Sequence, residues 1–118
     1  MSKNHWPIGG GIHSAIGQLI PEGATILELG SGDGTKQLAQ KYTIWSIEHD
    51  EKWVGYCDLA NYIHAPIISL LNENIQWYDP SILEISIPAS YDLILIDGPP
   101  GKYGREGILE NFHLFRTD

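Results

Sequence analysis

The sequence has few basic residues, a single cysteine and no long apolar run. Only 7 of its 118 residues are Lys or Arg, against 15 Asp or Glu, and the formal net charge is −8. Nucleic-acid binding needs basic side chains clustered at phosphates, so this composition argues against a nucleic-acid partner. The lone Cys57 excludes an internal disulfide framework and a cluster of thiolate metal ligands.

Signals for membranes and secretion are equally scarce. No apolar stretch approaches the roughly 18 residues of a membrane span, and the opening residues MSKNHWPIGGG contain no apolar core of a secretory signal. We therefore expect one cytoplasmic domain over residues 1–118, with no membrane partner. Hydrophobic residues make up 42% of the chain, which is enough for a packed core.

Short apolar segments alternate with helical patterns along the chain. Apolar residues recur at helical spacing over 11–20, and Pro21 and Gly23 end that pattern. We predict strands over 25–29, 43–48 and 91–97, with further candidates over 62–67, which Pro66 ends or confines to an edge, and over 74–79. We predict a helix over 35–42 and another over 51–60, which Asp50 caps and which carries Trp53, Cys57 and Ala60 on one face. A closing helix is marked by Ile108, Leu109, Phe112 and Phe115.

This alternation predicts an α/β fold, a three-layer sandwich around a mainly parallel sheet. The continuously apolar segment 93–96 indicates a strand covered on both faces. Ligands of such sheets bind outside the carboxyl ends of the strands. The loops 30–34 and 97–105 both follow predicted strand ends, so we expect them to open on the same edge of the sheet.

Residues 26–35, ILELGSGDGT, contain the glycine loop, residues 30–34, with glycine at every second position. A nucleoside-triphosphate loop is excluded because Gly34 is followed by Thr35 and Lys36, the wrong order for G-K-[ST]. A dinucleotide motif fits Gly30 and Gly32 but has Thr35 where the third glycine belongs. An NAD-binding domain therefore stays open as an alternative.

The spacing Glu28-x-Gly30-x-Gly32-x-Gly34 resembles the first motif of the class I S-adenosylmethionine (AdoMet)-dependent methyltransferases. Glycines let a backbone bend tightly and approach a ligand closely. Glu48 stands about 20 residues after Glu28, where an acidic residue accepts hydrogen bonds from ribose hydroxyls. The segment YDLILIDGPPG resembles the fourth strand of the same enzymes, and parts of the sequence are similar to their sugar O-methyltransferase subset. The resemblance extends roughly from residue 12 to residue 110.

The resemblance implies an incomplete, Rossmann-like methyltransferase fold. The resembled enzymes build further strands beyond the fourth, for which no sequence follows here. The fourth strand would then lie at an edge, with unpaired backbone groups. We expect that edge to be covered by the closing helix, by self-association or by a partner chain, or the sequence to be part of a larger protein.

The resemblance also implies a set of AdoMet-binding residues. They are Glu28, Gly30, Ser31, Gly32 and Gly34 around the methionine part, Glu48 at the ribose, Trp77, Tyr78 and Asp79 beside the adenine, and His49 as a further cofactor-binding residue. Three of them have a structural alternative: Glu48 could belong to an exposed run EHDE, Trp77 to the core, and Asp79 to the turn before Pro80.

Asp97 is the candidate catalytic residue, because the resembled enzymes end their fourth strand beside the transferred methyl group. It could act as a general base or bind a divalent cation. No second acidic ligand can be assigned, so no metal is claimed. The alternative is that Asp97 caps the following turn. Lys102 and Arg105 are candidates for binding an anionic acceptor, or are solvated loop charges.

Together these features predict an AdoMet-dependent O-methyltransferase that acts on a small-molecule or sugar hydroxyl and releases S-adenosylhomocysteine. The alternative is a truncated, non-catalytic AdoMet-fold domain that binds a nucleoside or a partner chain.

Overall fold

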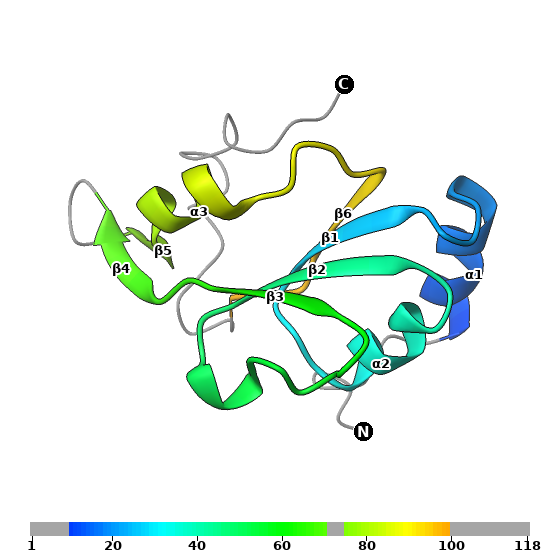
Figure 1. Ribbon diagram of the computed structural model, residues 1–118, viewed down its shortest axis with the longest axis horizontal. Helices are drawn as coiled ribbons and strands as arrows, with labels where there is room; N and C mark the ends of the chain where they lie inside the picture. Colours follow the sequence, from blue (N-terminus) through cyan, green and yellow to red (C-terminus); the bar gives the residue numbers. More distant parts are fainter. Residues whose placement is uncertain (1–9, 71–74, 100–118) are drawn as a thin grey trace.

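A four-stranded parallel sheet forms the centre of the molecule (Figure 1). The computed structural model describes residues 10–70 and 75–99, with side chains from residue 13 onward. The strands lie in the order β3-β2-β1-β6. Their bounds are Thr25–Leu29 for β1, Thr43–Glu48 for β2, Asn61–His64 for β3 and Leu93–Ile96 for β6. The fold is therefore α/β, and the predicted strands 25–29 and 43–48 are confirmed at both ends.

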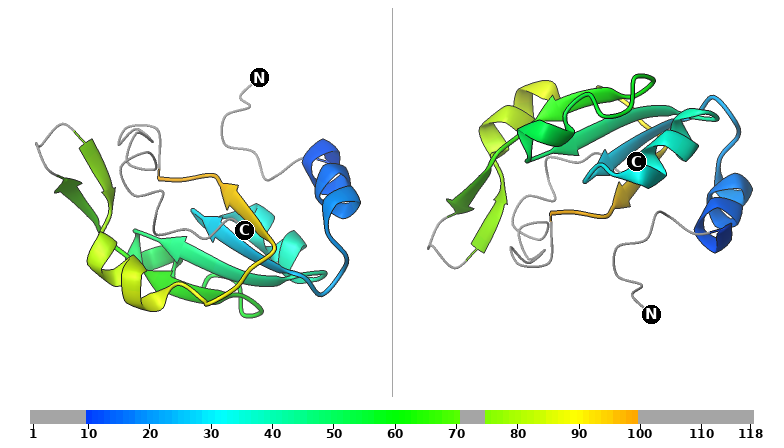
Figure 2. Two further views of the ribbon diagram at one scale, coloured as in Figure 1. Left: turned by 90° about the horizontal axis from the view of Figure 1, so that it is seen from above. Right: turned by 90° about the horizontal axis from the view of Figure 1, so that it is seen from below.

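Successive residues of the central strands face opposite sides of the sheet, as a pleated strand requires. Ile26 and its register partner Ile44 belong to one buried cluster, with Ile16 and Leu38 from the helices α1 (Gly10–Leu19) and α2 (Asp33–Ala39). Leu27 lies in the opposite cluster with Leu83 of the helix α3 (Pro80–Ser86). Helices thus pack on both faces, which gives three layers (Figure 2).

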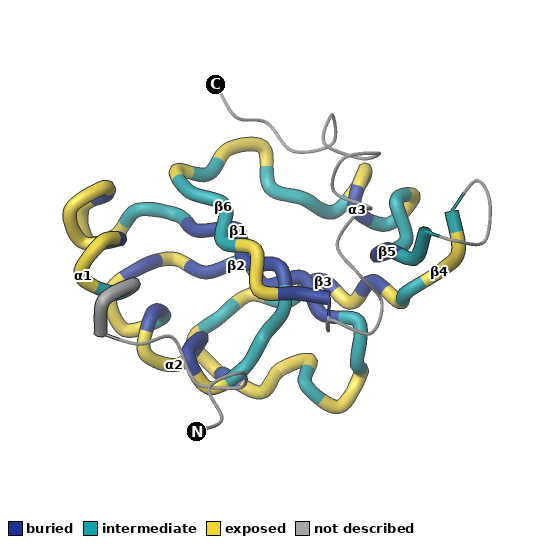
Figure 3. The backbone as a smooth tube through the Cα atoms, turned by 180° about the vertical axis from the view of Figure 1, so that it is seen from behind, coloured by how far each residue is buried: buried dark blue, intermediate teal, exposed yellow. Residues whose placement is uncertain are grey.

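Burial is deepest in the two central strands, β1 and β2, as the dark tube in Figure 3 shows. β6 is less covered: three of its residues are half-buried and Ile96 is 42% exposed. The expectation of a strand covered on both faces is therefore wrong for its last residue. Among the described residues no strand pairs with the outer side of β6, so there it is an edge strand, as expected.

A separate two-stranded antiparallel sheet joins β4 (Ile67–Leu70) and β5 (Ile75–Tyr78). The predicted strand over 74–79 exists, but it pairs with β4 and not with the parallel sheet. The third parallel strand is β3, which ends before Pro66, as expected from the missing N–H of proline. α3 then begins behind Asp79, whose carboxylate accepts a hydrogen bond from Ser81 N at 3.0 Å.

The predicted helix over 51–60 is wrong. Only one 3-10 turn, η1 (Glu51–Trp53), forms there, and Asp50 caps it by accepting a hydrogen bond from Lys52 N at 3.0 Å. Val54 is extended and Gly55 has φ of 84°, a left-handed conformation that a helix cannot continue through. The cap is thus confirmed, whereas Trp53 and Cys57, despite their helical spacing, do not lie on one helix.

The first helix is confirmed, and α2 begins and ends earlier than predicted. Gly32 precedes α2 in an extended conformation, and Lys41 and Tyr42 both donate backbone hydrogen bonds to Leu38 O, which closes the helix. Within residues 10–70 and 75–99, no helix has the length and apolarity needed to cross a membrane. The predicted closing helix lies outside the described residues.

Candidate functional site

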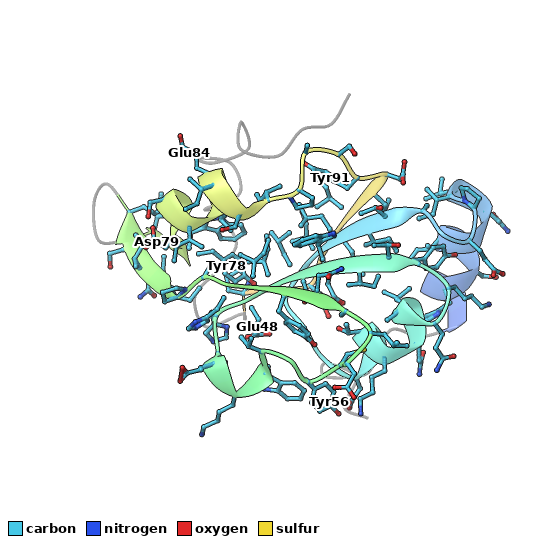
Figure 4. All side chains as sticks on the ribbon, in the orientation of Figure 1. Glu48, Tyr56, Tyr78, Asp79, Glu84 and Tyr91 are labelled. Carbon is cyan, nitrogen blue, oxygen red and sulfur yellow. The ribbon has the colours of Figure 1, made fainter. Side chains whose placement is uncertain are left out.

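A pocket of about 400 Å³ opens at the carboxyl ends of three parallel strands. Its size falls within the range of small-molecule sites, roughly 300–1,000 Å³. β1, β2 and β6 each run directly into it, and β5 contributes its last residue. In the described part of the chain, the lining residues are Gly30, Ser31, Glu48, His49, Asp50, Trp53, Tyr78, Asp97 and Gly98. Glu48 and Tyr78 lie near the middle of the molecule in Figure 4.

Two glycines allow the loops after β1 and β6 to touch backbone to backbone. Gly30 has φ of +94°, and a Cβ there would lie 3.0 Å from the Gly98 Cα. A Cβ on Gly98 would lie 2.9 Å from the Gly30 Cα and 2.5 Å from the Tyr78 hydroxyl oxygen. Backbone atoms cannot yield to such contacts as a flexible side chain can. Both positions therefore require glycine, and the pocket floor is formed by main chain.

Glu48 is buried, with 3% of its surface exposed, although it belongs to the charged run EHDE. Its Oε1 accepts a hydrogen bond from Ser31 N at 2.9 Å, and its Oε2 accepts one from Asp50 N at 2.8 Å. His49 Nδ1 lies 3.1 Å from the same Oε2. The alternative that Glu48 is a solvated surface charge is therefore wrong. Its carboxylate joins the glycine loop to the segment that follows β2.

Glu28 lies behind the pocket and does not line it. It is 1% exposed, and its Oε1 accepts hydrogen bonds from Thr35 Oγ1 at 2.8 Å and from Ser46 Oγ at 2.9 Å. Burial raises the pKa of Glu28 to about 7, against the lowering effect of the two hydroxyls, and the negative charges of Asp97 and Glu48 add to the rise. Glu28 therefore fixes the start of α2 through Thr35 and lies outside the pocket lining.

The pocket is acidic. Glu48, Asp50 and Asp97 line it, and none of the lining residues within 10–70 and 75–99 is Lys or Arg. Asp97 is exposed, and its backbone N donates to Leu29 O at 2.9 Å, which holds the end of β6 against β1. In the described part of the chain, no three His, Cys, Asp or Glu side chains are grouped as a metal site would require. The arrangement favours a ligand that carries positive charge.

The pocket brings together six of the residues expected from the sequence: Gly30, Ser31, Glu48, His49, Tyr78 and Asp97. Gly32 and Gly34 instead form the start of α2. Trp77 is fully buried in the core cluster, as its structural alternative held. Asp79 caps α3 and also accepts from Ser81 Oγ at 2.8 Å, which confirms its turn role. Lys102 and Arg105 lie outside the described residues.

Sequence reasoning missed three lining residues: Asp50, Trp53 and Gly98. Asp50 and Trp53 had been assigned to the cap and core of a helix that does not form. A signal for Gly98 was present, because a glycine directly after a strand-end carboxylate allows a close backbone approach. Its partner, Gly30, becomes apparent only when β6 is paired with β1.

Comparisons with known proteins add no relative to this picture. No protein-family model, no curated protein and no solved structure matches the chain.

Proposed function

We propose that this chain is a class I AdoMet-dependent methyltransferase with a Rossmann-like fold, acting on the hydroxyl of a small molecule or sugar. The strand order β3-β2-β1-β6 supports the fold, because a doubly wound sheet starts its two halves on either side of its first strand. The pocket lies at that switch point, outside the carboxyl ends of β1 and β6.

The acidity of the pocket is the observation that carries the proposal. AdoMet has a sulfonium and an ammonium group against one carboxylate, so it is a net cation. Glu48, Asp50 and Asp97 would attract such a ligand. The same carboxylates would repel the pyrophosphate of NAD, which needs backbone N–H groups and no nearby negative charge. The acidic lining therefore favours AdoMet over the NAD alternative, although Glu48 suits the ribose of either.

The residues present fit the parts of AdoMet. Each Glu48 oxygen accepts one backbone N–H, and His49 Nδ1 lies 3.1 Å from Oε2. A carboxylate has about four lone-pair sites, so at least one remains for a ribose hydroxyl. The main chain at Gly30 and Ser31 would hold the methionine part, where a Cβ on Gly30 would be excluded. Of the three residues expected at the adenine, only Tyr78 lines the pocket.

Bound AdoMet supplies an electrophilic methyl group. Asp97 directly follows the carboxyl end of β6 and is exposed, so its carboxylate can accept a hydrogen bond from an acceptor hydroxyl and take up the proton. Asp97 thus keeps its proposed role as general base. The role of Lys102 and Arg105 in binding an anionic acceptor stays a prediction.

Isothermal titration with S-adenosylhomocysteine tests the proposal on three proteins: wild type, Glu48→Gln and Glu51→Gln. The last removes an equal charge from an exposed residue of η1 and is the matched control. We expect wild-type dissociation constants of about micromolar order, a loss of about tenfold in Glu48→Gln, and no change in Glu51→Gln. NAD should give no heat.

A folded wild type that binds no S-adenosylhomocysteine would contradict the proposal. Binding without methylation of any hydroxyl acceptor, in assays with labelled AdoMet, would favour the alternative of a non-catalytic AdoMet-fold domain. Binding of NAD alone would favour the dinucleotide alternative.

A further inference from the structure

Two segments each contribute a wall of the pocket, and one tyrosine hydroxyl connects them. The first is the glycine loop. The second is loop 49–60, which follows β2 and contributes His49, Asp50 and Trp53 to the lining. Tyr62 lies in β3, directly after loop 49–60. Its Oη is 3.0 Å from Cys57 N in loop 49–60 and 3.0 Å from Ser31 Oγ in the glycine loop.

The direction of these two hydrogen bonds follows from the donors present. The backbone N–H of Cys57 can only donate, so the Tyr62 hydroxyl accepts that bond. The hydroxyl hydrogen of Tyr62 is then available for Ser31 Oγ. The other neighbour of Ser31 Oγ is Thr35 Oγ1, at the longer distance of 3.4 Å. Tyr62 is therefore the closer of the two partners that hold the Ser31 side chain.

Ser31 is held at both its side chain and its backbone. Its N–H donates to Glu48 Oε1 at 2.9 Å, and its side chain contacts Tyr62. A rotation of the Ser31 peptide would break the hydrogen bond to Glu48. Because Tyr62 holds the Ser31 side chain, it opposes that rotation. Tyr62 is half-buried and pairs in register with Ser46, which lies beside Glu28. The hydroxyl thus acts within a partly buried polar network, where each hydrogen bond matters more than at the surface.

We infer that Tyr62 is a positioning residue, whose hydroxyl fixes the separation of the glycine loop and loop 49–60 and thereby presents Ser31 and Glu48 to the ligand. The inference deepens the proposed function and rests on it only for the identity of that ligand. Tyr62 itself does not line the pocket, so its effect is exerted through Ser31 and Cys57.

The test compares Tyr62→Phe with Tyr42→Phe. Tyr42 is buried, and its hydroxyl makes no hydrogen bond within residues 10–70 and 75–99, so its substitution controls for loss of a phenol oxygen alone. Amide hydrogen exchange by NMR on the ligand-free proteins reports the Ser31 and Cys57 N–H groups. Titration with S-adenosylhomocysteine reports affinity.

In Tyr62→Phe we expect exchange of both the Ser31 and the Cys57 amides to accelerate about fivefold and affinity to fall about fivefold, the usual effect of one lost hydrogen bond. Tyr42→Phe should change neither. Ser31→Ala removes the other end of the same bond, and the double variant should lose no more affinity than Ser31→Ala alone, because the two groups act as one unit.

The inference would be overturned if exchange accelerated only at the Cys57 amide, while the Ser31 exchange rate and the affinity stayed unchanged. Tyr62 would then hold loop 49–60 alone. Additive losses in the double variant would overturn it as well. If the wild type binds no S-adenosylhomocysteine, the proposed function fails, while the Ser31 exchange rates still decide the role of Tyr62. Should Tyr62→Phe not fold, the exchange rate of the Cys57 amide in Ser31→Ala provides the test. A faster rate supports the connection between Ser31 and Cys57 through Tyr62, and an unchanged rate contradicts it.

Discussion

The two walls of the pocket are held by different kinds of contact. On the side of the glycine loop the contacts are buried: Gly30 touches Gly98 through main chain, and Thr35 donates to the buried carboxylate of Glu28. In loop 49–60 they lie mostly at the surface. Asp50 accepts from Lys52 N, and the Tyr56 hydroxyl donates to Asp33 Oδ1 at 2.6 Å, both in exposed positions.

Buried and exposed contacts respond differently to substitution. A buried polar group or a close backbone contact leaves no room for adjustment, so changes there are costly. An exposed hydrogen bond is readily replaced by water, and an exposed charge is screened. We therefore regard the glycine loop as the preorganised wall of the pocket and loop 49–60 as the adaptable one.

Gly98→Ala should have the largest effect. Its new Cβ would meet the Gly30 Cα at 2.9 Å, so the two loops must separate. We expect the free energy of unfolding to fall by about 2–4 kcal/mol, as for other overpacked sites, measured by urea denaturation. The control is Gly55→Ala in loop 49–60, where φ is +84° and no atom lies within 4 Å of the new Cβ. Only the backbone conformation is strained there, at about 1–2 kcal/mol. Equal losses would contradict the difference between the walls.

Glu28→Gln should have the next largest effect, and one that depends on pH. The pKa of Glu28 is raised to about 7 in the folded protein from 4.5, so between these values the folded state binds more protons than the unfolded state. Stability contributed by the protonated carboxyl is thus complete below pH 4.5 and is lost as pH rises through 7. Relative to Glu28→Gln, the wild type should lose up to about 3 kcal/mol between pH 5 and pH 8.

Urea denaturation at several pH values measures this loss. Glu51→Gln changes the net charge equally at an exposed site and controls for charge alone. If the unfolding free energies of the wild type and Glu28→Gln stay parallel from pH 5 to pH 8, Glu28 is ionised throughout. Burial of its carboxylate would then cost less free energy than we argue.

The sequence predicted the buried wall better than the exposed one, for a physical reason. The signals there are local: the apolar residues of β1, the β-branched and aromatic residues of β2, the glycine spacing after Leu29 and the position of Glu48. Each of these local preferences agrees with the fold. Loop 49–60 has the apolar spacing of a helix, with Trp53 and Cys57 four residues apart. One left-handed residue, Gly55, overrides that spacing.

Pairing partners were the second limit. Residues 75–78 have the composition of a strand, and they form one, but composition does not say which strand they join. The contact between Gly30 and Gly98, and the bridge from Tyr62 to Ser31, likewise join residues far apart in the chain. The site residues found from sequence are those at strand ends, whereas the residues that support them depend on topology.

The smallest effect is expected at Tyr56, the exposed link between loop 49–60 and α2. Its hydrogen bond to Asp33 raises the pKa of the Tyr56 hydroxyl, with a small opposing effect from Lys36, whose Nζ lies 4.3 Å from the centre of the ring. Asp33→Asn should therefore lower that pKa towards the ordinary value, observed by NMR titration of the tyrosine ring carbons. Because Tyr56 lies at the surface, Tyr56→Phe should weaken S-adenosylhomocysteine binding less than Tyr62→Phe does. An equal loss in the two variants would mean that the exposed link orders loop 49–60 as firmly as the buried one, and the contrast between the walls would not hold.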